Sequence, residues 1–267
     1  MGIGLVGLAS GVIDRRDVVG TIRAAAEGGF DAVGIWFDPA SWSTAREREV
    51  AAALADTGLV ALDMEALYIG GPDGRSHDHG EAMVDAALAI GARNVLCVGP
   101  GVGPGPFAER FGELADRAAA GSTDRAPLTL SVEPTKLFSI ALLTDAVDVM
   151  ERSARPNTGI LLDNLHISRM GLDPAVGAEL DQGWIRYAQV CDAPAQPRGW
   201  SPTELRADAV DDRCNLGEGD LDVVAFVGSL PPDTPCNLEI LSSALRELDP
   251  VPRAKSVREA CRRTLGV

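Results

Sequence analysis

Four short apolar segments in the second half of the chain each lead to a side chain with oxygen donors. These side chains are Glu133, Asp163, Gln189 and Glu239. Apolar runs of this length predict buried strands. The ends of four such strands converge only if the strands lie parallel around a common axis. The pattern therefore predicts a barrel with a chemical site at its mouth.

Three carboxylates at one mouth would repel one another and raise each other's pKa unless a cation neutralises them. A divalent ion satisfies this requirement. Oxygen ligands that include an amide and no thiolate favour Mn²⁺ or Mg²⁺, with Co²⁺ and Zn²⁺ left open. The alternative for any single position is a carboxylate that caps a helix or forms a salt bridge. Four such positions together favour the metal site.

The rest of the sequence alternates strands and helices, as such a barrel requires. The expected strands are 2–8, 30–36, 59–65, 94–99, 128–132, 160–162, 185–188 and 236–238. The expected helices are 14–29, 44–57, 77–90, 108–120, 142–153, 174–180, 221–230 and 252–265, with a loop at 100–107 and a long polar excursion at 193–220. Eight strand and helix units without a linker predict an α/β fold, a (β/α)8 TIM barrel with residues 1–267 in a single domain.

Composition agrees with this architecture and excludes some partners. The length of 267 residues suits a barrel of about 250. Apolar residues make up 46% and aromatic residues 4%, so the core must consist of small aliphatic side chains, as in helix-covered parallel sheets. The formal charge of −15 disfavours binding to nucleic acid or to an anionic membrane.

The sequence also predicts a cytoplasmic protein. No window approaches the roughly 20 apolar residues of a membrane span, and the N-terminus lacks the basic region of a signal peptide. The five cysteines are widely spaced and include no CxxC pair, so we expect reduced thiols.

Five motifs carry a resemblance to a known family. They are SVEP (131–134), LLDNLH (161–166), AQVCDAP (188–194), LGEGD (216–220) and NLEI (237–240). In these motifs, and over its whole length, the chain resembles the sugar phosphate isomerase/epimerase family of the xylose isomerase-like TIM barrel superfamily. The motifs are specific for the superfamily but not for a substrate.

The resemblance implies that Glu133, Asp163, Gln189 and Glu239 are the metal ligands. It also implies that His166 contacts a substrate hydroxyl or carbonyl, the alternative being a strand-end histidine bonded to a backbone carbonyl. Many relatives have His in place of Gln189, and Gln is found in the hydroxypyruvate isomerase-like and dehydroshikimate dehydratase-like branches. The ketose 3-epimerases are thereby disfavoured. The endonuclease branch needs more metal-binding histidines than the three present here.

This ligand set implies proton-transfer chemistry on a polyhydroxy carbonyl compound. A chelated divalent ion acidifies the C–H beside the carbonyl and stabilises the enediolate. Glu133 and Glu239 are the candidate general bases. We expect a metal-dependent isomerase or epimerase of a small keto-sugar. A dehydratase of the 3-dehydroshikimate or inosose type is the alternative, and a barrel that binds a ligand without turnover is the non-enzymatic one.

Further substrate-binding candidates come from the loops and strand ends. Glu65 closes the expected third strand, and Arg213 lies where related dehydratases bind a substrate carboxylate. Trp36, Lys136 and His77 are candidate wall residues. A second reading makes Glu65 an anchor for a basic residue, Arg213 a solvent-exposed side chain and His77 part of a polar loop before a helix. The expected partner is a small molecule, and a homodimer is left open.

Overall fold

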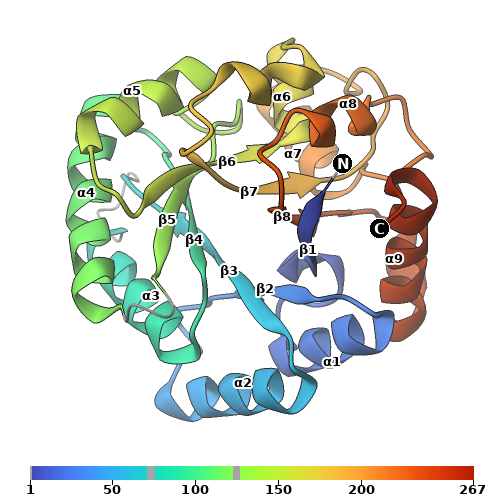
Figure 1. Ribbon diagram of the computed structural model, residues 1–267, viewed down its shortest axis with the longest axis horizontal. Helices are drawn as coiled ribbons and strands as arrows, with labels where there is room; N and C mark the ends of the chain where they lie inside the picture. The colour runs from blue at the N-terminus through green and yellow to red at the C-terminus, as the bar shows by residue number, and fades with distance from the viewer. Residues whose placement is uncertain (1, 71–75, 123–126) are drawn as a thin grey trace.

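Eight parallel strands close into a barrel in the computed structural model of the protein, which describes residues 2–70, 76–122 and 127–267, apart from the side chains of 76–78. The strands follow one another in sequence order, and β1 pairs with β8 to complete the circle. Helices surround the barrel (Figure 1). The predicted (β/α)8 fold is confirmed.

The strands lie close to the ranges expected from apolar patterning. They are β1 (Ile3–Leu8), β2 (Ala32–Trp36), β3 (Val60–Tyr68), β4 (Asn94–Val98), β5 (Thr129–Val132), β6 (Thr158–Asp163), β7 (Ile185–Val190) and β8 (Thr234–Leu238). The helices are α1 (Val18–Gly28), α2 (Thr44–Thr57), α3 (Ser76–Ile90), α4 (Pro104–Gly121), α5 (Leu143–Ser153), α6 (Asn164–Met170), α7 (Pro202–Val210), α8 (Val223–Gly228) and α9 (Pro250–Leu265). Short 3₁₀ turns lie at Ser10–Val12, Pro174–Glu179 and Leu245–Glu247.

Apolar side chains fill two layers. The larger layer lies between the barrel and its helices and includes Ile22, Phe107 and Phe226. The smaller one fills the inside of the barrel and includes Leu62, Leu161 and Tyr187. Because successive side chains of a strand alternate between its two faces, the residues two positions beyond Leu161 and Tyr187 also face the barrel interior.

Helix ends follow local sequence signals. The Asp17 side chain accepts a hydrogen bond from the Gly20 N–H at 2.9 Å and caps α1. That helix ends at Gly29, whose φ of 79° is the left-handed conformation that glycine adopts without a Cβ clash. Ser43 caps the start of α2 and Gly58 ends it in the same way, which is why the expected range 44–57 matches the observed helix.

Strand β3 and helix α4 depart from their expected boundaries, and a helix that was not expected follows β6. Strand β3 continues past Glu65 to Tyr68 and pairs with β4 through Leu67 and Tyr68. The stretch 100–107 is not all loop, because α4 begins at Pro104, where a proline fits the first turn of a helix. His166 lies in a helix and not at a strand end, because α6 starts directly after Asp163.

The polar excursion 193–220 contains α7 and is fixed to the barrel by a buried ion pair. Arg169 of α6 donates to Asp208 of α7 through Nε at 2.8 Å and Nη2 at 2.9 Å. The same guanidinium donates to the carbonyl oxygens of Pro194 and Ala195. The excursion is therefore held over the β6 and β7 side of the barrel.

Across the described part of the chain, none of the helices combines the length and hydropathy needed to cross a membrane.

Candidate metal centre

Asp163 and Gln189 lie side by side in the barrel at the carboxyl end of its strands. The backbone register pairs Asp163 with Gln189, and Gln189 with Asn237 on β8. Asp163 is two residues beyond Leu161, and Gln189 is two beyond Tyr187. Since Leu161 and Tyr187 fill the barrel interior, the two polar side chains occupy the next layer toward the mouth.

The carboxylate of Asp163 is fixed from two sides. Its Oδ1 accepts the backbone N–H groups of Leu165 at 2.7 Å and His166 at 3.3 Å, so it caps α6. Its Oδ2 accepts a hydrogen bond from Arg213 Nη1 at 2.7 Å. Burial alone would raise the pKa of Asp163, but the charge of Arg213, together with the hydrogen bonds that the carboxylate makes, outweighs burial and holds the pKa at about 2.

Arg213 joins two of the expected ligands. Its Nη2 lies 2.8 Å from Glu239 Oε2, and its Nε donates to the Ala209 carbonyl at 2.7 Å. The residue is only 3% exposed. Although burial opposes its charge, Asp163 and Glu239 raise the pKa of Arg213. Arg213 is thus a buried counter-charge for the site, and the solvent-exposed reading of it was wrong.

Glu133 follows β5 and faces His166. The distance between Glu133 Oε1 and His166 Nε2 is 3.7 Å, and Thr135 Oγ1 lies 3.2 Å from His166 Nδ1. Burial, and then the charge of Asp163, raise the pKa of Glu133. Burial lowers the pKa of His166 to about 4, so its imidazole is neutral at pH 7. One donor atom from each of Glu133, Asp163 and His166 lies within 4.8 Å of the other two.

Gln189 is the clearest sign that these residues fit a cation. The side chain is fully buried, yet neither Oε1 nor Nε2 has a hydrogen-bond partner among the described residues. A buried amide without a partner is costly, and a divalent ion would satisfy its oxygen. Carboxylate oxygens accept more than one bond, so the contacts of Arg213 do not prevent ligation by Asp163 or Glu239. The donor set fits a divalent ion.

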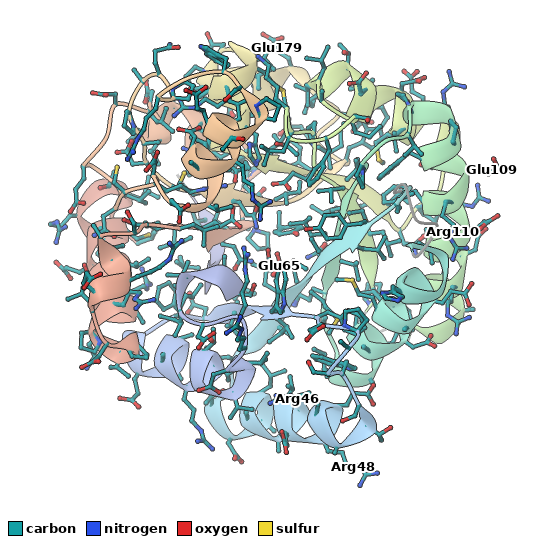
Figure 2. The ribbon with its side chains drawn as sticks, turned by 180° about the vertical axis from the view of Figure 1, so that it is seen from behind. Arg46, Arg48, Glu65, Glu109, Arg110 and Glu179 are labelled. Carbon is teal, nitrogen blue, oxygen red and sulfur yellow. The ribbon has the colours of Figure 1, made fainter. Side chains whose placement is uncertain are left out.

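A second polar cluster lies beside this centre in the barrel. Asn237 Nδ2 donates to Asp63 Oδ1 at 2.9 Å, and Glu65 Oε1 accepts the backbone N–H of Ser10 at 3.1 Å. Burial, and then the charge of Glu65, raise the pKa of Asp63. Figure 2 shows Glu65 among the barrel strands, whereas Arg48 on α2 points away from the barrel. Within the described parts of the chain, Glu65 therefore anchors backbone and not a basic side chain.

Trp36 and Lys136 make their described contacts outside this cluster. Trp36 ends β2 and is covered by the guanidinium of Arg15, 4.4 Å from its ring centroid. Lys136 is exposed and donates to the Arg169 carbonyl at 2.6 Å, with its Nζ 5.0 Å from the Trp200 ring centroid. The side chain of His77 lies outside the described residues. Substrate contact stays a prediction for all three.

Sequence reasoning missed Arg15 and Arg206. Arg15 follows β1 in the loop before α1, and Arg206 lies on α7 within the excursion after β7. Both segments belong to the carboxyl face of the barrel, where such loops build sites. Basic residues in loops that follow strands were the signal that would have found them.

Comparison with known proteins gives a family match. A family model described as a xylose isomerase-like TIM barrel matches residues 22–264. Among curated proteins, none matches the sequence.

Solved structures share the fold at low sequence identity. A xylose isomerase-like TIM barrel/4-hydroxyphenylpyruvate dioxygenase fusion protein has a TM-score of 0.82 at 18% identity; the match covers 98% of this chain but 43% of that one. An IolI protein with a binding zinc atom gives 0.78 at 14% identity, with 98% of each chain covered. The D-allulose 3-epimerase from Methylomonas sp., in complex with D-allulose, gives 0.72 at 16%, covering 99% of this chain and 98% of the other.

Proposed function

Since this chain belongs to the xylose isomerase-like TIM barrel family, we propose that it is a divalent-metal-dependent isomerase or epimerase of a small polyhydroxy carbonyl compound. The observation that carries the proposal is the convergence of Glu133, Asp163 and His166, with donor atoms within 4.8 Å of one another. The buried Gln189 amide without a partner supports it.

Glu133, Asp163, Gln189 and Glu239 would hold the ion, for which Mn²⁺ or Mg²⁺ fits an oxygen donor set. When bound, the ion would supply Lewis acidity that polarises a substrate carbonyl and acidifies the adjacent C–H. Asp163 is held from two sides, because its two oxygens accept bonds from the α6 backbone and from Arg213.

Glu133 and Glu239 carry the proton transfer in this proposal. They follow β5 and β8, on different sides of the barrel, so they approach a substrate in the mouth from different directions. One glutamate would take the proton from carbon, and the other would return it to the neighbouring carbon or to the opposite face. Unlike Asp163, neither glutamate caps a helix in the described structure.

His166 would orient the substrate. Its imidazole is neutral at pH 7 because burial lowers its pKa to about 4. Thr135 contacts one ring nitrogen at 3.2 Å. The other nitrogen lies on the Glu133 side, where it can exchange a hydrogen bond with a substrate hydroxyl or carbonyl oxygen.

The test combines metal analysis with product analysis. The protein is stripped with EDTA, reloaded with Mn²⁺ or Mg²⁺, assayed for bound metal and incubated with a panel of keto-polyols in D₂O. We expect one divalent ion per chain and a product that carries deuterium with an unchanged oxygen count. A product lighter by one water would replace the isomerase proposal with a dehydratase. Tight ligand binding without turnover would make the protein a binding barrel.

A further inference from the structure

Four arginines line one cavity on the carboxyl face of the barrel. The cavity has a volume of about 290 Å³, and its charged wall residues are Arg15, Arg16, Arg206, Arg246 and Asp14. They come from the segments that follow β1, β7 and β8, which are neighbours in the barrel. The cavity therefore opens on the same face as Glu239 and Asp163.

The charge of this cavity is opposite to that of the chain. The protein has a formal charge of −15, yet the cavity wall holds four arginines against one carboxylate. An anionic ligand approaching the molecule is repelled by most of the surface and attracted here. Such a local reversal of charge concentrates an anion at one place.

Arg15 is positioned, and among the described residues it has no anionic partner. Its guanidinium stacks over the Trp36 ring at 4.4 Å, which leaves the edge of the guanidinium open to an acceptor. Its Nε is buried and has no hydrogen-bond partner in the described residues. Trp36 pairs in register with Glu65, so Arg15 lies above the β2 and β3 side of the barrel mouth.

Arg206 faces the same space from the other side. It is exposed on α7, yet its charge and that of Arg15 both act on the hydroxyl of Tyr68 at the end of β3. Burial raises the pKa of Tyr68, the two arginines lower it, and Glu65 and Glu133 raise it. Arg15 and Arg206 line the same cavity, and the segments that carry them follow strands of the barrel, as Glu133 does.

Two other arginines nearby, Arg246 and Arg213, already have partners within the protein. Arg246 pairs with Asp211 and donates to the Val210 carbonyl. Arg213 is 3% exposed and donates to Asp163, Glu239 and Ala209. A substrate anion in the mouth therefore needs a different cation from Arg213, and Arg15 and Arg206 can supply it.

We infer that Arg15 and Arg206 bind an anionic group of the substrate, a carboxylate or a phosphate ester, while its carbonyl end lies at Glu133 and Asp163. The inference rests on the proposed function and narrows its substrate class from neutral sugars to acidic polyhydroxy carbonyl compounds. Planar guanidinium groups bind both kinds of anion in bidentate fashion.

The test uses three probes with one carbon skeleton: glycerol, glycerate and glycerol 3-phosphate. Their affinities are measured by calorimetry at low salt for the wild type, Arg15→Gln, Arg206→Gln and the control Arg23→Gln, whose arginine is exposed on α1. We expect at least one anionic probe to bind more than tenfold tighter than glycerol. The two mouth variants should each lose about tenfold or more, with unchanged melting temperatures, and the control should lose less than twofold.

The two anionic probes distinguish a phosphate subsite from a carboxylate subsite. Equal affinity for all three probes would overturn the inference, and so would equal losses in all three variants, which would indicate general charge attraction. Each measurement is made on EDTA-treated and Mn²⁺-loaded protein, with bound metal determined. Anion selectivity in a protein that binds no divalent ion would contradict the proposed function and leave the arginine subsite in place. Metal binding without anion selectivity would overturn the arginine subsite and leave the proposed function in place.

Discussion

Arg213 Nη1 lies 2.7 Å from Asp163 Oδ2, and both side chains are almost completely buried. The pair joins the segment after α7 to the end of β6, 50 residues apart in sequence. It also brings a permanent positive charge next to three carboxylates that would otherwise repel one another. The ligand cluster is therefore partly neutralised by the protein itself, and the rest of its negative charge is available to a divalent ion.

Removing the Arg213 charge should destabilise the metal-free protein strongly. Arg213→Ala leaves the carboxylates of Asp163 and Glu239 buried without their cation, which costs about 3 to 5 kcal/mol. Mn²⁺ should restore part of this loss, because it supplies the missing positive charge. Urea denaturation with EDTA and with Mn²⁺ measures both effects. A loss below about 1 kcal/mol in EDTA would contradict this role of Arg213.

Glu133→Gln should keep the fold and lose about 10²-fold or more in turnover, because an amide cannot accept the proton. The loss must be measured on variant protein whose metal content equals that of the wild type. Glu109→Gln, which changes an exposed glutamate of α4, is the matched control and should keep full turnover. A metal-replete Glu133→Gln enzyme with near-normal rates would remove Glu133 from proton transfer.

The barrel and most of the centre were predictable because they depend on local patterns. Short apolar runs that end in a carboxylate mark strand ends, and strand ends in a closed barrel must meet. The proximity of Asp163 and His166 also follows from local sequence, since an aspartate that caps a helix lies within three residues of the groups it bonds.

The partners of Arg213 and the position of Arg15 were not predictable from sequence. The Arg213 contacts span 50 residues to Asp163 and 26 to Glu239, and no local pattern encodes a pairing of that kind. Arg15 is positioned by stacking on Trp36, which lies at the end of a different strand, β2. The extension of β3 past Glu65 depends on pairing with β4, which the β3 sequence alone does not specify.

Asp63→Asn should stabilise the protein at high pH. Burial, and then the charge of Glu65, raise the folded-state pKa of Asp63 above the unfolded value of about 3.9. The folded state then binds more protons than the unfolded state between these two values, so stability falls as pH rises through that range. The introduced asparagine would not titrate, so the variant does not lose stability in this way as pH rises. Its amide keeps an oxygen that accepts the hydrogen bond from Asn237.

We therefore expect Asp63→Asn to unfold at higher urea than the wild type at pH 8, with a difference that shrinks toward pH 4. Leu161→Val alters the same inner layer of the barrel without changing a polar group, so its pH profile should run parallel to that of the wild type. A constant offset of Asp63→Asn across the whole range would show that the carboxyl does not titrate differently on folding.

The Arg169 and Asp208 pair gives a test in which burial is the main variable. Both side chains are 3% exposed, and Asp208→Ala leaves Arg169 buried without its anion, a loss of about 3 to 5 kcal/mol. Arg117 holds Asp85 through the same two-bond geometry, but these side chains are 42% and 53% exposed. Asp85→Ala should therefore cost no more than about 1 kcal/mol.

Urea denaturation of both variants at 0.1 M and 0.5 M NaCl measures this contrast. Salt should reduce the smaller loss further, because exposed charges are screened, and should leave the larger one nearly unchanged. Asp208→Ala should also speed proteolysis within 193–220, since Arg169 no longer holds α7 against α6. Equal losses in the two variants would mean that the excursion is held by its other contacts, such as the Arg169 bonds to Pro194 and Ala195.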